Sequence, residues 1–250
     1  MADDSSKARQ FAGRTVFVHL PPGYDPDRPE PYPLLLLQDG QNLAAWREDA
    51  LGGSWRADET IDRLVDDAFL PPLVLAGIDH AGEDRVREFT PTRGRVAGAG
   101  QAAAYGRWLV NDLLPAIAAE VNVRTDFDGV GLGGSSLGGL ITLWIASMWP
   151  ERFGRILLMS PSVWWDGRVI LRHLRGQPLD QATRVWLDAG LNEGRVVVRD
   201  ARALRDLLRS QGQRSLRYVE DPDGDHSEES WGRRFGDAIS YLFSDKTMRP

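Results

Sequence analysis

Short apolar runs alternate with longer segments of helical periodicity along this chain, and this alternation limits the possible folds more than any other feature. Several runs are apolar at nearly every position, as strands buried on both faces require. The pattern predicts an α/β fold, with a doubly wound, mostly parallel sheet and helices on both faces. The predicted strands cover residues 15–20, 34–38, 73–78, 129–133, 156–160, 185–189 and 216–220, and the predicted helices cover residues 58–67, 102–121, 137–148, 196–210 and 228–243.

The composition is that of a globular chain with a large core. Of the 250 residues, 42% are apolar and 26% are charged, so we expect one folded domain over residues 1–250. A net charge of −6 disfavours nucleic acid or an anionic membrane as a partner, because both select basic proteins. The absence of cysteine excludes disulfides, a thiolate nucleophile and cysteine-ligated metals. The first ten residues lack the apolar stretch of a signal peptide, which predicts a cytoplasmic location.

Residues 131–140 read GLGGSSLGGL and contain the pattern G-x-S-x-G centred on Ser136. The pattern alone is weak evidence, but here a predicted strand leads into it and a predicted helix follows it, as a serine nucleophile on a tight turn requires. Gly134 and Gly138 would leave room for that turn between strand and helix. Ser136 is therefore the candidate nucleophile, beside a helix N-terminus that favours negative charge. A glycine-rich turn that packs closely or binds an anion is the alternative interpretation.

A serine hydroxyl needs a base to remove its proton, and the base needs an acid to orient it. His226 lies in a polar loop between the last predicted strand and the last predicted helix, where doubly wound hydrolases carry the base. The acid is expected after the strand at 185–189, and Glu193 lies in that loop. Asp188, at the end of the strand, is the alternative, because its direction depends on the strand register.

Beyond these residues, several sequence blocks together resemble a known enzyme family. The blocks are residues 16–24, 36–42, 74–79, 87–91, 133–139, 160–165, 189–193 and 225–231. In this order they resemble the esterase branch of the α/β-hydrolases, which includes enterochelin-esterase-like hydrolases, feruloyl esterases and S-formylglutathione hydrolases.

The resemblance implies the α/β-hydrolase fold and a Ser-His-Glu triad of Ser136, His226 and Glu193. It also implies an oxyanion hole formed by the backbone N–H groups of Leu137 and Gln41. Many relatives carry His-Gly in the loop after the third strand, whereas this chain has Asp-Gly at positions 39 and 40. The oxyanion donors are main-chain groups, so this substitution need not affect them.

Two further groups of side chains are candidates for binding the substrate. Trp164 and Trp165 would offer an apolar surface to an acyl or aromatic group, with core packing as the alternative. Arg87 lies in an arginine-rich loop that could recognise an anionic substrate such as a ferric catecholate. The alternative there is a solvated loop with an ion pair between Arg85 and Glu88.

Together these features predict a serine carboxylic-ester hydrolase that works through an acyl-enzyme, with no metal and no organic cofactor. The expected partner is a small-molecule ester, such as a short acyl, sugar-acyl or siderophore ester. An acyltransferase with the same triad is the first alternative, because an alcohol can replace water in the second step. A non-catalytic binding module is the second.

Overall fold

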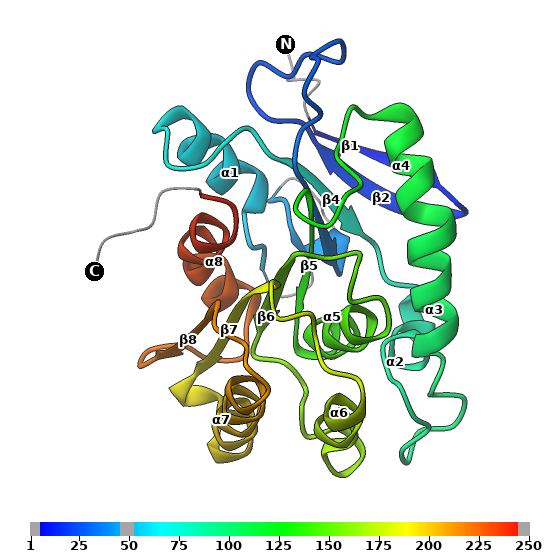
Figure 1. Cartoon of the computed structure of the whole chain (residues 1–250), viewed down its shortest axis with the longest axis vertical. Helices are drawn as coiled ribbons and strands as arrows, with labels where there is room; N and C mark the ends of the chain where they lie inside the picture. Colours follow the sequence, from blue (N-terminus) through cyan, green and yellow to red (C-terminus); the bar gives the residue numbers. More distant parts are fainter. Residues whose placement is uncertain (1–5, 46–52, 245–250) are drawn as a thin grey trace.

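The computed structural model describes residues 6–45 and 53–244. In this part of the chain, eight strands form one sheet in the order β1-β2-β4-β3-β5-β6-β7-β8 (Figure 1). The strands are β1 (Ser6–Phe11), β2 (Arg14–His19), β3 (Leu34–Gln38), β4 (Val74–Ile78), β5 (Val130–Ser135), β6 (Arg155–Met159), β7 (Arg184–Gly190) and β8 (Leu216–Asp221). The strands from β4 through β8 in this order pair in parallel, while β2 pairs antiparallel with both of its neighbours. The predicted, mostly parallel sheet is therefore confirmed.

Helices cover both faces of the sheet (Figure 1). On one face, α1 (Ala57–Asp66) and α8 (Glu228–Phe243) share a core with alternate residues of the strands. The other face is covered by α3 (Ala102–Trp108), α4 (Leu114–Glu120), α5 (Ser136–Met148), α6 (Trp165–Gly176) and α7 (Arg195–Ser210). The short α2 (Arg85–Glu88) and the 3-10 turns η1 (Gly40–Asn42), η2 (Gly82–Asp84) and η4 (Leu191–Glu193) lie in the connections.

The central strand β3 shows why its sequence is a continuous run of leucines. Leu34 and Leu36 pack into the core on one face, and Leu35 and Leu37 pack into the core on the other. All four side chains are fully buried. Because successive side chains of a strand point to opposite faces, a strand covered on both sides needs an apolar residue at each position.

The predicted helix at 102–121 is interrupted. A π-helical turn, η3 (Leu109–Leu113), separates α3 from α4. Pro115, near the start of α4, has no N–H to donate to the carbonyl four residues earlier, and its ring crowds that carbonyl. A wider turn just before the proline accommodates this loss, as π-turns inside helices commonly do.

Besides the short α2 and the 3-10 turns, strand β1 and helix α6 are absent from the sequence prediction. Strand β1 lies at the sheet edge and buries only Phe11, so its sequence lacks the apolar run of an internal strand. In helix α6, the residues after Trp165, namely Asp166, Gly167 and Arg168, have positive φ, and regular helical geometry begins only after them. The hydrophobic periodicity of β1 is weak because the strand lies at the sheet edge, and that of α6 is weak because its first turn is not helical.

Candidate active site

Ser136, Glu193 and His226 follow three different strands of the parallel sheet. Ser136 is the first residue of α5 after β5, Glu193 lies in η4 after β7, and His226 lies between β8 and α8. The carboxyl ends of parallel strands meet at one edge of the sheet, where ligands of open α/β sheets bind. Residues far apart in the sequence are thereby brought together.

The turn at Ser136 has the strained geometry that the glycine pattern predicts. Ser136 has φ of 53°, in the left-handed region that residues with side chains rarely adopt. A Cβ atom on Gly134 would lie 2.8 Å from the backbone carbon of Gly138, and a Cβ on Gly138 would lie 3.0 Å from a carboxylate oxygen of Asp39. Only glycine fits at both positions without displacement, so the two residues allow the sharp turn that exposes the Ser136 hydroxyl.

The three side chains form a hydrogen-bonded chain. The Ser136 Oγ atom lies 3.0 Å from His226 Nε2, and His226 Nδ1 lies 2.7 Å from Glu193 Oε2. The Glu193 side chain is fully buried, whereas 42% of the His226 side chain is exposed. This arrangement lets the imidazole accept a proton from the hydroxyl while a buried carboxylate fixes its tautomer.

Asp188, the alternative acid, has other partners. Its carboxylate accepts hydrogen bonds from Trp186 Nε1 at 2.9 Å and from the Arg234 guanidinium at 3.1 Å. Burial raises the pKa of the Asp188 carboxyl, and the charge of Arg234 opposes that rise. Glu193, and not Asp188, is therefore the carboxylate that contacts His226.

A second group of side chains holds Glu193 in place, and the sequence analysis gave none of them this role. Glu193 Oε1 accepts hydrogen bonds from the Ser160 hydroxyl and from the backbone N–H of Gly190, the latter at 2.7 Å. Ser160 Oγ in turn accepts from Trp231 Nε1 at 3.1 Å and from Arg234 at 3.2 Å. The sequence analysis placed Ser160 at the end of a predicted strand and at the start of the block 160–165, and it assigned this residue no role. The Trp231 ring also packs edge-on against His226, with ring centroids 4.8 Å apart.

A cavity of about 440 Å³ opens at Ser136. Its lining is mostly polar and consists of Asp39, Asn42, His80, Arg85, Ser135, Ser136, His226, Ser227, Glu228 and Trp231. The carboxylate oxygens of Glu228 accept hydrogen bonds from Asn42, at 3.0 Å, and from the indole N–H of Trp55. Burial raises the pKa of Glu228 to about 7, although both hydrogen bonds favour the ionised form. Glu228 is thus a titratable group beside the nucleophile that sequence reasoning did not identify.

The prediction of an ion pair between Arg85 and Glu88 is wrong, because each residue has another partner. Arg85 binds the carboxylate of Asp39 through Nε at 2.6 Å and Nη2 at 2.8 Å. Glu88 instead accepts two hydrogen bonds from Arg14 of β2, at 2.7 and 2.9 Å. Both pairs join residues that only the folded sheet brings together, so nearness in the sequence was misleading.

The residues predicted to bind substrate lie elsewhere. Trp164 is 45% exposed, and Trp165 is buried with its Nε1 donating to the Thr92 carbonyl at 3.2 Å. Arg87 pairs with Asp84 at 2.8 Å within the α2 region. These three predicted side chains are not among the residues that line the Ser136 cavity.

The two predicted oxyanion donors lie near the start of helical segments that follow a strand. Leu137 follows Ser136 in α5, and Gln41 lies in η1 directly after β3. Asp39, just before η1, has φ of 59°, and a Cβ on Gly40 would collide with the Gly77 carbonyl. The loop that carries Gln41 therefore lies tightly against β4.

Within residues 6–45 and 53–244, no group of three or more histidine, aspartate or glutamate side chains could hold a metal ion. None of the helices in these ranges is both long enough and apolar enough to cross a membrane.

The family described as "Putative esterase" matches residues 12–242 of this chain. The chain belongs to this family. Family membership makes it a carboxylic ester hydrolase of the α/β-hydrolase type, in agreement with the sequence resemblance and with the fold.

Similar curated proteins include siderophore esterases. The uncharacterized protein YbbA of Bacillus subtilis is 29% identical over 197 residues, which cover 76% of this chain and 73% of YbbA. The iron(III) enterobactin esterase of Dickeya dadantii is 34% identical over 140 residues, covering 56% of this chain and 28% of that protein. The iron(III) salmochelin esterase of Escherichia coli O6:H1 is 30% identical over 200 residues, covering 74% and 44%. The chain thus spans less than half the length of these two siderophore esterases.

Solved structures share the fold. An IroE-like serine hydrolase from Shewanella oneidensis superposes with a TM-score of 0.76 at 19% identity, covering 96% of this chain and 80% of that one. The enterobactin esterase FES from Shigella flexneri, in the presence of enterobactin, superposes with a TM-score of 0.75 at 25% identity, covering 96% and 58%.

Proposed function

We propose that this chain hydrolyses carboxylic esters through an acyl-enzyme on Ser136, with His226 as the base and Glu193 as the acid. The observation that carries the proposal is the continuous hydrogen-bonded chain from Ser136 Oγ through the His226 imidazole to the buried Glu193 carboxylate. A surface histidine with no role would not need a fully buried carboxylate at 2.7 Å from its Nδ1.

In the first half-reaction, His226 Nε2 takes the hydroxyl proton as Ser136 Oγ forms a bond to the ester carbonyl carbon. Glu193 accepts a hydrogen bond from Nδ1–H and stabilises the imidazolium that results. The tetrahedral intermediate then breaks its bond to the alkoxide, which leaves with the proton from His226. In the second half-reaction, His226 takes a proton from water, the hydroxide attacks the acyl group, and Ser136 leaves with that proton.

We propose that the oxyanion binds the backbone N–H groups of Leu137 and Gln41. Leu137 lies in the first turn of α5, where N–H groups have no carbonyl partner within the helix. Gln41 lies in the loop that Gly40 packs against β4. Each such donor typically contributes about 10²-fold to 10³-fold in turnover.

The substrate is proposed to be a small, polar ester, such as a short acyl, sugar-acyl or siderophore ester. The support is the mostly polar lining of the 440 Å³ cavity, together with the siderophore esters that the names of two relatives contain. Trp164 and Arg87 are outside the lining of this cavity and Trp165 is buried, so the proposal gives none of the three a contact with a substrate held inside it.

The test is hydrolysis of p-nitrophenyl butyrate by the wild type, Ser136→Ala and His226→Ala. We expect each variant to lose about 10³-fold or more in kcat, because each removes a member of the triad. Ser210→Ala, which changes an exposed hydroxyl on α7, is the matched control and should keep the wild-type rate. Equal rates for Ser136→Ala and the wild type would refute the proposed function.

A further inference from the structure

Arg85 is held rigidly at the wall of the Ser136 cavity. Its Nε and Nη2 atoms donate to the two carboxylate oxygens of Asp39, at 2.6 and 2.8 Å. Its guanidinium also lies over the Phe89 ring, 5.3 Å from the centroid. A bidentate carboxylate on one edge and an aromatic face below fix the plane of the guanidinium, so little side-chain entropy is lost when another group binds it.

One edge of this guanidinium is unused. Arg85 Nη1 donates no hydrogen bond to any of the residues that the structure describes, whereas Nε and Nη2 are both engaged. The carboxylates of the cavity are already occupied, because Asp39 binds Arg85 and Glu228 binds Asn42 and Trp55. Of the arginine, aspartate and glutamate side chains that line the cavity in residues 6–45 and 53–244, Arg85 therefore has donors left for a ligand.

The charge of Arg85 is balanced within the cavity. Asp39 contributes one negative charge directly against it, and Glu228 adds a second carboxyl group. Among the described residues that line the cavity, Arg85 is the one arginine or lysine. An anionic group would therefore meet carboxylates as well as the guanidinium, and would gain little Coulomb energy. A neutral oxygen needs only the hydrogen bond, which the free Nη1 edge can donate.

We propose that Arg85 determines specificity by donating from Nη1 to an uncharged acceptor oxygen of the substrate, in an ether, hydroxyl or carbonyl group near the scissile ester. This proposal rests on the proposed esterase function and adds the substrate class to it. It assigns substrate recognition to Arg85, whose partner Asp39 is 46 residues away in the sequence.

The test uses two pairs of esters of equal shape, in which one CH2 is replaced by an ether oxygen. On the acyl side, p-nitrophenyl methoxyacetate is compared with p-nitrophenyl butyrate. On the alcohol side, 2-methoxyethyl acetate is compared with butyl acetate. For Arg85→Gln we expect kcat/KM to fall about tenfold more for the ether than for its carbon counterpart in at least one pair, since a charged donor is lost.

Two further variants keep the test decisive. Arg85→Lys retains a cation for Asp39 but lacks a second edge, so the preference for the ether over its carbon counterpart should be lost in this variant as it is in Arg85→Gln. Arg202→Gln is the matched control, because Arg202 forms an exposed bidentate pair with Glu220, at 2.7 Å for both bonds, outside the cavity. It should leave both ratios unchanged.

An equal loss on all four esters, carried by kcat, would overturn the proposal, because Arg85 would then act only by holding Asp39 and the loop that follows it. No loss on any ester would overturn it as well. Failure of the esterase function itself would show separately, as unchanged hydrolysis by Ser136→Ala.

Discussion

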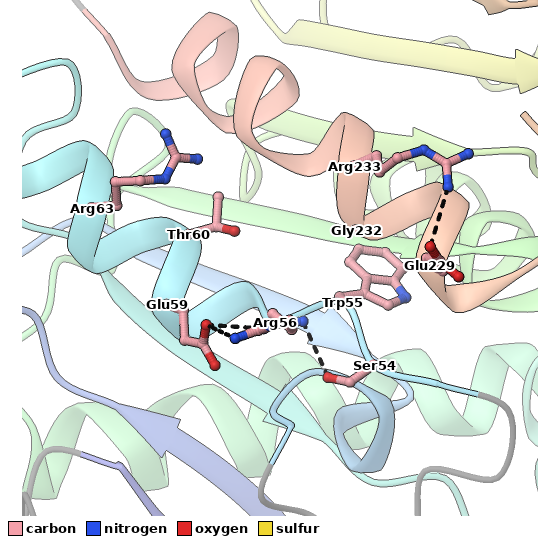
Figure 2. A pocket seen from close by; sticks show the side chains of 9 residues that line it. All are labelled: Ser54, Trp55, Arg56, Glu59, Thr60, Arg63, Glu229, Gly232 and Arg233. Carbon is pink, nitrogen blue, oxygen red and sulfur yellow. Dashed lines mark hydrogen bonds and ion pairs between the residues drawn. The ribbon is translucent and has the colours of Figure 1, made fainter. Parts of the chain in front are cut away.

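Two hollows in the surface border α8, and both contain arginine beside carboxylate, yet they are built differently. The groove between α1 and α8 has a volume of about 330 Å³ (Figure 2). Figure 2 shows its ion pairs, which join residues of the same segment: Arg56 with Glu59, three positions apart, and Arg233 with Glu229, four apart. In the Ser136 cavity the corresponding pairs come from distant parts of the chain.

The sequence distance between the paired residues distinguishes a solvated helix surface from a candidate active site. Pairs three or four residues apart need only the helix itself, and when exposed they contribute little to stability. The contacts around Ser136 span 90 residues to His226 and 33 from His226 to Glu193, so they exist only when the sheet is complete. The strained Ser136 lines the cavity, and His226, which also lines it, contacts the fully buried Glu193 carboxylate. Neither feature occurs among the described residues that line the groove in Figure 2.

The largest expected effect concerns His226. His226→Gln keeps a polar side chain of similar reach but removes the base, so kcat for p-nitrophenyl butyrate should fall by about 10³-fold or more. The fold should persist, because the His226 side chain is 42% exposed. A variant that retained a tenth of the wild-type kcat would show that the hydrogen-bonded chain is not the catalytic machinery.

The next effect separates the two buried carboxylates. Glu193→Gln should lower kcat about 10²-fold to 10⁴-fold, because an amide no longer stabilises the imidazolium. Asp188→Asn should act mainly on stability and lower the melting temperature, because Arg234 loses a charged partner in a buried environment. Measurements of kcat and Tm for both variants test which carboxylate is the acid of the triad. A larger loss of kcat for Asp188→Asn than for Glu193→Gln would contradict the assignment of Glu193.

A smaller effect is expected from Glu228, and it depends on pH. The ordinary pKa of this carboxyl is 4.5, and in the folded protein it is about 7. Folding therefore disfavours the carboxylate, and the stability that Glu228 contributes below pH 4.5 is lost as the pH rises through 7. Glutamine carries no charge to bury. The free energy of unfolding of Glu228→Gln, relative to that of the wild type, should therefore rise by about 1–2 kcal/mol when the pH is raised from 5 to 8.

Urea denaturation of both proteins at the two pH values measures this gain. A stability difference between wild type and variant that is the same at pH 5 and pH 8 would show that Glu228 titrates normally.

The smallest effect is expected in the groove of Figure 2. Arg56→Ala and Arg233→Ala remove exposed pairs formed within one segment, so each should change kcat/KM for p-nitrophenyl butyrate by less than about twofold. A tenfold loss in either variant would mean that this groove also takes part in substrate binding, and that the contrast between the two hollows is wrong.

The same contrast between local and long-range contacts separates what the sequence predicted from what it did not. The strand, turn and helix around Ser136 were predictable, because Gly134, Ser136 and Gly138 lie within five consecutive residues and their spacing encodes the turn. His226 and Glu193 were predictable from the order of strands, since each lies directly after the end of a parallel strand.

What the sequence did not predict depends on long-range packing. Arg85 was assigned to its near neighbour Glu88, but its partner is Asp39, which β4 and β3 bring beside it. Ser160 and Arg234 gave no signal, because a serine after a strand and an arginine on a helix are common. Their roles appear only when β6 and α8 pack around Glu193.

The most direct measurement of the central claim is covalent labelling with diisopropyl fluorophosphate, followed by mass spectrometry of the intact protein and its peptides. The reagent phosphorylates a serine that an adjacent base has activated. We expect one label per chain, on Ser136, and we expect esterase activity to fall in proportion to the labelling. The His226→Gln variant should gain no label over the same time. A wild-type protein that stays unlabelled, or one labelled on another serine, would contradict the account.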